Sequence, residues 1–447
     1  MRLLLKAIVT IRGYKPSKDL IMKYLFVFLL LCISLFVKGQ KITIVDASSK
    51  SPIPYATAVL RGGEYGFVAN DSGQVNMYNL RSSDILEFRS IGYISRKLIC
   101  KDIITGDSVL LQSSALELDE IIVKPMLADE YVRLALKSIS KNYYPDSFAT
   151  HHYYKEYLKE NNHYVNYSEA FLEAIQTGYL SPKDSFDFRI RAGHKSGKDE
   201  LEFMLKEREK EIKKELKSAK KNGQEATSED FVMPLEIGNP PFLLSLDPLR
   251  NADQTFVVNN DNVDFLDSAT HTQYEFWYGK PVEYGNQSLV VVHFDQKKKV
   301  HKPMLAGTMW IEQSTNAFVK IEFGISDYGQ NHIIPGYMKA ALWIYGLSFD
   351  IKNTLVEFNY QPFKGKWALG GVRLKADVFL EKRRLFSENE ASDFVYECEM
   401  LTTELHSYPY TFKSSLAYDY KKLISEQLPE TPANEWQKLK QESRTYR

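Results

Sequence analysis

The chain has 447 residues, of which 57 are basic and 57 acidic, and aromatic residues make up 13% of it. Balanced charge leaves no electrostatic footprint for nucleic acid, which excludes proteins that bind DNA or RNA through a basic face. The length allows two or three domains, and the 28 tyrosines and 25 phenylalanines favour β structure, in which flat side chains fill pleated faces.

Residues 1–39 have the layout of a secretory signal peptide. A basic residue precedes the unbroken apolar run Tyr24–Val37, whose 14 residues are fewer than the ~18 needed to span a bilayer. Cleavage is predicted between Gly39 and Gln40. The basic residue follows Met22 directly, so Met22 is an alternative start, and an uncleaved anchor is the competing interpretation.

Removal of residues 1–39 leaves a net charge of −6, because that segment holds seven basic residues and one acidic residue. We therefore expect an exported protein in the periplasm, at the outer membrane or on the cell surface, with no transmembrane span in the mature chain. Cys100 and Cys398 remain. Two distant thiols do not make a disulfide framework, and they are interpreted as small apolar core residues, with a bridge between them left open.

Residues 40–124 predict a small β-sandwich. Apolar and polar residues alternate from 41 to 46, which indicates a strand. Pro52 and Pro54 fix φ and withhold N–H groups, so they mark a turn or a sheet edge. The segment Asn70-Asp71-Ser72-Gly73 has turn chemistry. Several such short strands at a spacing of about 8–12 residues are typical of a sandwich.

Four stretches of this region are KITIVDASSKSPIPYATAVL, VANDSGQVNM, DILEFRSIGY and VLLQSSALELDEIIV. Together they resemble the carboxypeptidase-like regulatory domain of Bacteroidota envelope proteins, and they are similar to the module that precedes many TonB-dependent receptors. The resemblance implies an immunoglobulin-like, transthyretin-like sandwich that makes contacts rather than catalysing a reaction. Its motif positions, each of which also suits a turn or a core, are Asp46, Pro54, Tyr55, Ala56, Asp71, Gly73, Gly92 and Tyr93, with Leu118-Asp119-Glu120-Ile121.

Residues 125–145 predict a linking helix, because apolar residues recur at 127, 131, 134, 135 and 139 and two acidic residues lie near its start. Residues 146–420 predict a large, twisted antiparallel sheet or half-barrel, since aromatic-rich alternating runs recur through them. The segment 307–325 predicts a hairpin with its turn at 314–316. A polar tail, 421–447, ends the chain.

The second region also resembles the C-terminal part of proteins that carry the regulatory domain, and more loosely the sheet of periplasmic lipoprotein carriers. The similar stretches are Tyr154-Lys155-Glu156, Ser168-Glu169-Ala170, NPPFLLSLDPLRN, Tyr274-Glu275-Phe276 and LAGTMWIEQSTNAFVKIEF.

Two charged segments interrupt this region. Residues 198–222 predict a charged helical insertion that packs one apolar seam on the sheet, with a partner-binding coiled coil as the alternative. Residues 297–302 are basic and predict a solvated hairpin loop, with a phosphate site as the alternative. The apolar seam of the insertion consists of Leu201, Leu205, Ile212, Leu216 and Ala219.

Local catalytic motifs are missing from the sequence. None of the nine histidines begins a His-x-x-Glu motif, which a zinc carboxypeptidase needs. The pairs His152/Glu156 and His271/Glu275 have helical spacing in a strand context, where residues four apart do not meet. Neither a Gly-x-Ser-x-Gly elbow nor a phosphate loop occurs. We therefore predict no catalytic residue, no cofactor and no metal site.

The leading hypothesis is a non-enzymatic, exported envelope protein that binds a protein, glycan or lipid partner. The first alternative is a periplasmic carrier of lipid or lipoprotein, and the second is a hydrolase whose triad is assembled across the fold. Four tryptophans on alternating segments are candidates for a sugar or peptide platform, although core filling is favoured for them. They are Trp277, Trp310, Trp343 and Trp367.

Overall fold

The structure is a computed structural model, and it confirms the predicted mainly β fold with few helices. The signal segment with Gly39, and the motif positions 118–121, lie outside the described residues. The structure describes residues 40–61, 66–77, 80–103, 108–114, 126–197, 201–221, 239–250, 257–258, 261–285, 287–384 and 388–436.

The N-terminal domain consists of two four-stranded layers around one apolar core. One layer has the order β3-β2-β5-β7 and the other β4-β1-β8-β6. Alternate residues of each strand point inward, so Ile44, Ala58, Phe88 and Leu111 are fully buried between the layers. The strands are β1 (Gln40–Asp46), β2 (Thr57–Leu60), β3 (Gly66–Val68), β4 (Gln74–Met77), β5 (Ile85–Arg89), β6 (Tyr93–Ile94), β7 (Arg96–Ile99) and β8 (Ser108–Ser113).

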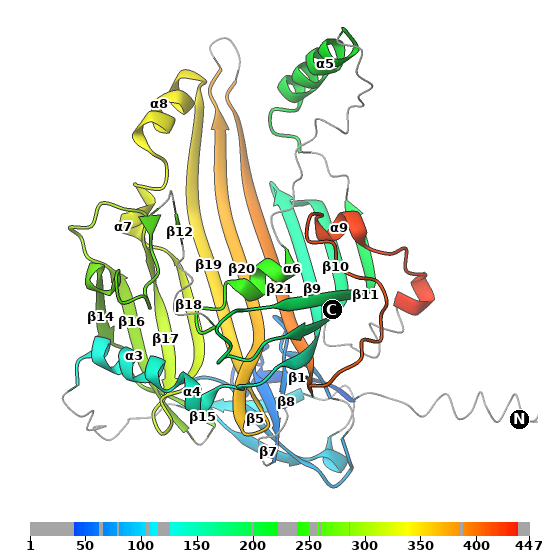
Figure 1. Ribbon diagram of the computed structural model, residues 1–447, viewed down its shortest axis with the longest axis vertical. Coiled ribbons are helices and arrows are strands. Elements are labelled where there is room, and N and C mark those ends of the chain that lie inside the picture. Colours follow the sequence, from blue (N-terminus) through cyan, green and yellow to red (C-terminus); the bar gives the residue numbers. More distant parts are fainter. Residues whose placement is uncertain are drawn as a thin grey trace, which may run out of the picture.

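The second layer of the sandwich continues into the main sheet. Gly285 of β15 pairs with Ile94 of β6 in parallel, which gives a sheet of fifteen strands in the order β11-β10-β9-β21-β20-β19-β18-β17-β16-β15-β6-β8-β1-β4, with β14 also on β16 (Figure 1). The strands outside the sandwich are β9 (Phe148–Glu160), β10 (His163–Gln176), β11 (Phe186–Gly197), β14 (Tyr274–Tyr278), β15 (Val282–Gly285), β16 (Gln287–Gln296), β17 (Leu305–Glu312), β18 (Phe318–Ile325), β19 (Leu347–Phe363), β20 (Lys366–Lys382) and β21 (Glu390–Ser407).

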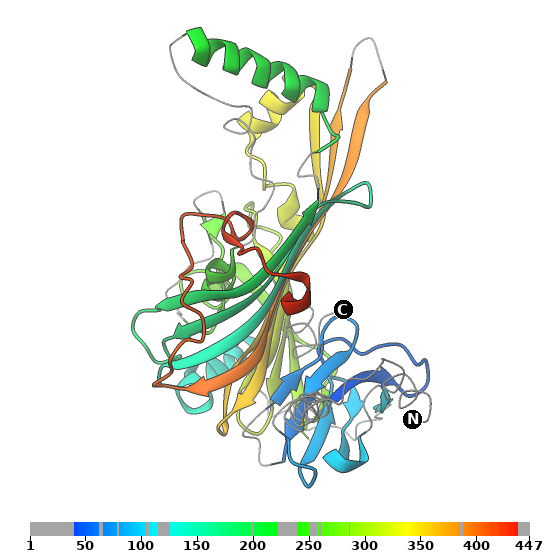
Figure 2. The same cartoon turned by 90° about the vertical axis from the view of Figure 1, so that its right-hand side faces the viewer.

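Most helices are short, and the longest, α5, projects beyond the sheet (Figures 1 and 2). The linking segment forms α3 and α4, within the range predicted for a helix. Among the described residues, none of the helices combines the length and the apolar character needed to cross a membrane. The helices are α3 (Ala128–Lys137), α4 (Ile139–Asn142), α5 (Leu205–Lys221), α6 (Pro240–Ser245), α7 (Asp327–Gln330), α8 (Gly336–Ile344) and α9 (Ile424–Gln427).

The sandwich and α6 lie on opposite faces of the main sheet (Figure 2). Successive side chains of a strand point to opposite faces. Accordingly, Lys155 of β9 reaches Asp71 of the sandwich, with Nζ and Oδ2 3.1 Å apart. Its neighbour Tyr154 is buried in the core of the other face, where Leu243 and Leu244 of α6 also lie. The two faces are therefore both covered in this part of the sheet, by different segments of the chain.

The segment after α6 anchors it to the sheet through buried polar groups. Asp247 accepts hydrogen bonds from the hydroxyls of Tyr179 (2.9 Å) and Tyr360 (2.7 Å). Arg250 donates to the carbonyl of Thr177 (2.9 Å) and to the side chain of Gln176. Burial raises the pKa of Asp247, and Arg250 opposes that rise. This network holds the NPPFLLSLDPLRN stretch in place.

Two predicted local elements have clear outcomes. The hairpin predicted for 307–325 is confirmed as the antiparallel pair β17 and β18, with Asn316 in the turn at a φ of 60°. Within the predicted charged insertion, Leu205–Lys221 forms the helix α5. Figures 1 and 2 show α5 projecting beyond the sheet, while Leu201, the first residue of the predicted apolar seam, packs against the core of the main sheet. The dense charge of α5 favours solvent over a packed face.

We expect Gly73→Ala to destabilise the sandwich more than Gly92→Ala does. Both glycines have left-handed φ values, 68° and 81°, which cost an alanine ~1 kcal/mol or more. A Cβ on Gly73 would lie 2.6 Å from the carbonyl oxygen of Ile44, whereas one on Gly92 meets nothing within 4 Å. Urea unfolding should show that Gly73→Ala lowers the free energy of unfolding by about 2 kcal/mol more than Gly92→Ala does. Equal losses in the two variants would show that the close approach to Ile44 does not destabilise Gly73→Ala.

Candidate binding cleft

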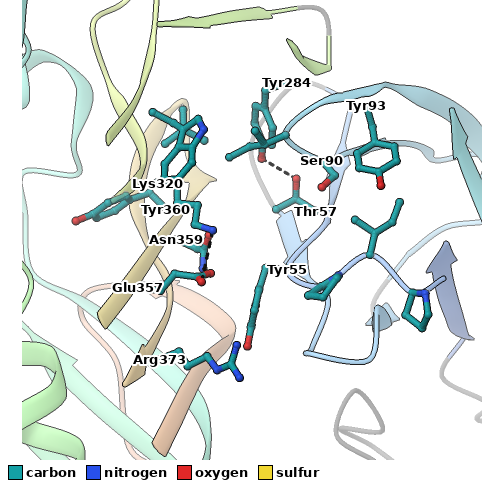
Figure 3. A pocket seen from close by; sticks show the side chains of 16 residues that line it. Tyr55, Thr57, Ser90, Tyr93, Tyr284, Lys320, Glu357, Asn359, Tyr360 and Arg373 are labelled. Atoms are coloured by element: carbon teal, nitrogen blue, oxygen red, sulfur yellow. Dashed lines mark hydrogen bonds and ion pairs between the residues drawn. The ribbon is translucent and has the colours of Figure 1, made fainter. Parts of the chain in front are cut away.

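A cleft with a volume of about 490 Å³ separates the sandwich from the main sheet (Figure 3). One wall comes from the sandwich, from the Pro52–Thr57 segment and from Ser90 to Tyr93. The other wall comes from β15, β17, β18, β19 and β20. The cleft therefore exists only because the two parts of the chain pack side by side.

Tyr55 projects from the sandwich wall toward Arg373 of β20 (Figure 3). Its φ is 56°, a left-handed value that bulky residues rarely adopt, and such strain concentrates at functional sites. The tyrosine hydroxyl is buried and lies beside the carboxylate of Glu399. Burial raises the pKa of Tyr55, and the neighbouring carboxylate of Glu399 raises it further.

The sheet wall carries charged and amide side chains on one face of neighbouring strands. Lys320 of β18 lies opposite Asn359 of β19, and Glu357 of β19 lies opposite Arg373 of β20. The ammonium of Lys320 is 3.4 Å from a carboxylate oxygen of Glu357, and Asn359 donates to Glu357 at 2.6 Å. The same ammonium lies 5.0 Å from the ring centroid of Trp310. These contacts hold the polar wall in a fixed geometry.

A buried hydrogen bond joins the two walls of the cleft (Figure 3). The hydroxyls of Thr57 on β2 and Tyr284 on β15 are 2.7 Å apart. Burial raises the pKa of Tyr284, so this phenol keeps its proton and can donate or accept at neutral pH. The bond fixes the distance between the two walls at this point.

The cleft offers aromatic surface beside hydrogen-bonding groups. Its described lining residues include a single carboxylate, that of Glu357, and neither histidine nor cysteine. The arrangement is suited to holding a polar ligand against aromatic rings.

The structure brings some of the predicted motif positions together and leaves others apart. Pro54, Tyr55 and Tyr93 line the cleft. Asp71 lies at its margin in the ion pair with Lys155. The remaining positions have local roles: Asp46 accepts from the backbone of Ser48 and Ser49, Ala56 is fully buried, and Gly73 and Gly92 have positive φ.

The four tryptophans have different environments. Trp367 is buried, as favoured for all four, and Trp310 lines the cleft. Core filling is wrong for Trp277 and Trp343, whose exposed fractions are 47% and 69%. Trp343 lies on α8 rather than on a strand, and Trp277 takes the outward position of β14. Alternation alone did not show which face of each segment would be covered.

The two histidine–glutamate pairs considered from the sequence have structural partners. His152 lies 2.7 Å from the hydroxyl of Thr150, and Glu156 accepts from two tyrosines, Tyr154 and Tyr396. His271 stacks on Phe276 with ring centroids 4.5 Å apart. The first pair and His271 are therefore held by buried or aromatic neighbours, whereas Glu275 is exposed on β14.

The cysteines lie in separate cores, Cys100 in the sandwich and Cys398 in the main sheet, and no disulfide joins them.

The sequence did not predict one cluster of possible metal ligands. His151, Glu404 and His406 have ligand atoms within 4.8 Å of one another. A search for local spacing cannot find His151, which comes from another strand. The available signal was Glu-x-His, because residues two apart on a strand share a face.

No family model matches the chain, and no curated protein matches it. A DUF1329 family protein from Desulfovibrio piger is similar at 9% identity and a TM-score of 0.22, over 64% of this chain and 95% of that one. A candidate membrane-associated protein of unknown function from Bacteroides fragilis is similar at 11% identity and a TM-score of 0.13, over 83% of this chain and 99% of that one. Scores this low support neither a shared fold nor a shared function.

Proposed function

We propose that this chain is an exported, non-enzymatic protein of the cell envelope that binds a short glycan segment in the cleft between sandwich and sheet. The observation that carries the proposal is the composition of the cleft walls. Tyr55 and Trp310 offer apolar ring faces, while Lys320, Glu357 and Asn359 offer donors and acceptors. Sugar rings combine apolar C–H faces with hydroxyl groups, so they match both kinds of surface.

The dimensions and rigidity of the cleft support the same ligand class. Its volume of about 490 Å³ falls within the range of about 300–1,000 Å³ that is usual for small-ligand sites. The ladder of polar contacts on the sheet and the Thr57–Tyr284 bond hold both walls in place before a ligand arrives. A preformed site loses less conformational entropy on binding.

Two parts of the proposal, that the chain is exported and that the sandwich makes regulatory contacts, rest on the sequence. The apolar N-terminal segment supports export, and the resemblance to the carboxypeptidase-like regulatory domain supports a role in contacts rather than catalysis. The cleft gives three motif positions a common location, because Pro54, Tyr55 and Tyr93 all line it. Location in the periplasm or at the outer membrane follows from the same proposal.

A lipid carrier has less support. Such a carrier needs an open apolar cavity, and the described inner face of the sheet is packed by the chain itself. Phe265 stacks on Phe294 of β16 with ring centroids 4.1 Å apart, and Leu243 and Leu244 of α6 are fully buried. A lipid would have to displace these side chains.

Binding to defined oligosaccharides tests the proposal. We expect a labelled panel of di- and trisaccharides of hexoses, N-acetylhexosamines and hexuronic acids to include at least one that binds. Trp310→Ala and Asn359→Ala should each weaken that binding at least tenfold by calorimetry, since each removes one kind of contact. Trp277→Ala is the matched control, because this tryptophan is exposed on β14 and lies outside the cleft.

Two results would overturn the glycan proposal. One is that no saccharide of the panel binds. The other is that Trp310→Ala and Asn359→Ala, both shown to unfold like the unmodified chain, bind as tightly as it does. Mass spectrometry of the bound saccharide gives a separate test of the non-enzymatic part, because cleavage of the saccharide would contradict it.

A further inference from the structure

A second polar cluster lies on the main sheet, away from the residues that line the cleft. It consists of His151 near the start of β9 and of Glu404 and His406 near the end of β21. Glu404 pairs directly with His151, and His406 pairs with Ala149. The three side chains therefore come from two adjacent strands.

A β-bulge puts these side chains on one face. The register between β21 and β9 shifts between Thr402 and Glu404. Thr402 pairs with His152, whose side chain is directed to the core of the other face. Without the extra residue, the alternation would place Glu404 on that inner face as well. Bulges of this kind re-aim side chains and are common next to functional sites.

The distances within the cluster match the spacing of ligands around one metal ion. Oε2 of Glu404 lies 3.2 Å from Nδ1 of His151 and 3.0 Å from Nε2 of His406. Two ligand atoms of one tetrahedral zinc, each about 2.1 Å from the metal, are about 3.4 Å apart. Small side-chain shifts would therefore bring all three atoms to one cation.

His151 is oriented from its other nitrogen by the partly buried Tyr410 and, behind it, the buried Glu173. Its Nε2 lies 2.6 Å from the hydroxyl oxygen of Tyr410, which lies 3.5 Å from Oε1 of Glu173. Glu173 is fully buried and also accepts from the backbone of Lys413 (2.8 Å) and Ser414 (3.2 Å). A carboxylate behind the imidazole is the usual support of a metal-binding histidine, because it fixes the ring and its tautomer.

The other nitrogen of His151, Nδ1, lies 3.2 Å from Oε2 of Glu404 and belongs to a side chain that is only 3% exposed. Two tautomers of the ring fit this geometry. In one, Nδ1–H donates to Glu404 and Nε2 accepts from the hydroxyl of Tyr410. In the other, Nε2–H donates to Tyr410, and Nδ1 and the carboxylate present lone pairs that one cation can bridge.

We propose that His151, Glu404 and His406 bind one divalent transition-metal ion, with Zn²⁺ as the best match. Two imidazoles and one carboxylate are ligands that zinc accepts, and three protein ligands leave one tetrahedral position open. The side chains of Glu404 and His406 are 25% and 35% exposed, so the ion can enter from solvent. Bound metal would tie the end of β21 and the segment around Tyr410 to β9.

Zinc titration of the full exported chain, prepared without an affinity tag, tests this site. We expect one equivalent of Zn²⁺ to bind, and Co²⁺ in its place to give the intense visible absorption of a tetrahedral ion. His406→Ala and Glu404→Gln should each weaken Zn²⁺ binding at least 100-fold. Both side chains are partly exposed, so these variants are expected to fold, and circular dichroism checks that they do.

The matched control is the double variant His301→Ala/His332→Ala. These histidines form the other close pair, with ring centroids 5.7 Å apart, but they belong to no three-residue cluster of metal-ligand type among the described residues. The double variant should keep full zinc binding. The proposal is overturned if the unmodified chain binds no Zn²⁺, if His406→Ala and Glu404→Gln bind it normally, or if the control variant loses it.

Discussion

Replacement of Arg250 by alanine is expected to lower the free energy of unfolding by about 3–5 kcal/mol, as is usual when one partner of a buried charged network is removed. The side chain of Arg250 is 1% exposed, and its guanidinium lies 3.7 Å from Asp247 and 3.6 Å from Asp184. Without it, the fully buried carboxylate of Asp247 keeps only its neutral hydrogen-bond donors. Urea denaturation followed by tryptophan fluorescence measures the loss.

Arg133→Ala is the control for this prediction. Arg133 forms an ion pair with Asp129 at 2.6 Å on α3, but the two side chains are 53% and 30% exposed. Exposed pairs contribute little, so the loss should stay below about 1 kcal/mol. The double variant Arg250→Ala/Asp247→Asn should recover part of the stability lost in Arg250→Ala. Similar losses in Arg250→Ala and Arg133→Ala would show that Asp247 does not depend on the buried cation.

Replacement of Lys155 by alanine is the second large effect that we expect, at about 3 kcal/mol at pH 8. The ammonium lies 3.2 Å from Glu399 on β21 and 3.1 Å from Asp71 of the sandwich. Glu399 is 1% exposed, so loss of the Lys155 ammonium leaves this buried carboxylate without its ion-pair partner. Because Lys155 also joins sandwich and sheet, the variant should release the sandwich at a lower urea concentration than the main sheet.

The loss of unfolding free energy in Lys155→Ala should become smaller as the pH falls. Burial already raises the pKa of Glu399 above its ordinary value, and Lys155 opposes that rise. In the variant, the pKa of Glu399 is therefore higher in the folded state than in the unfolded state. A raised carboxyl pKa stabilises the folded state below the unfolded pKa, near 4.5, and this contribution disappears as the pH rises through the folded pKa. A loss that is the same at pH 5 and pH 8 would contradict this account.

Lys159→Ala provides the comparison on the same strand and the same face. Its ammonium lies over the rings of Tyr157 and Tyr164, at 5.1 and 4.5 Å from their centroids. Loss of these cation–π contacts should cost about 1 kcal/mol or less. The cost should also be independent of pH between 5 and 8, because Lys159 forms no ion pair with a buried carboxylate among the described residues.

Local features of the sequence determined the elements of this protein. Alternation of apolar and polar residues gave the strands, and the turn residues at 314–316 gave the hairpin of β17 and β18. The periodicity after residue 127 gave the helix α3. These predictions succeeded because each depends on neighbouring residues and on the backbone geometry of one element.

Tertiary structure alone decided where the sites lie. The cleft depends on Tyr55 and Trp310, which are far apart in sequence and meet only because β6 pairs with β15 and the sandwich packs on the sheet. The cluster of His151, Glu404 and His406 depends on the bulge after Thr402, which turns Glu404 toward His151. Alternation shows that a strand has two faces, but the partner strands and the covering segments determine what each face contacts, and that information is distributed over the whole chain.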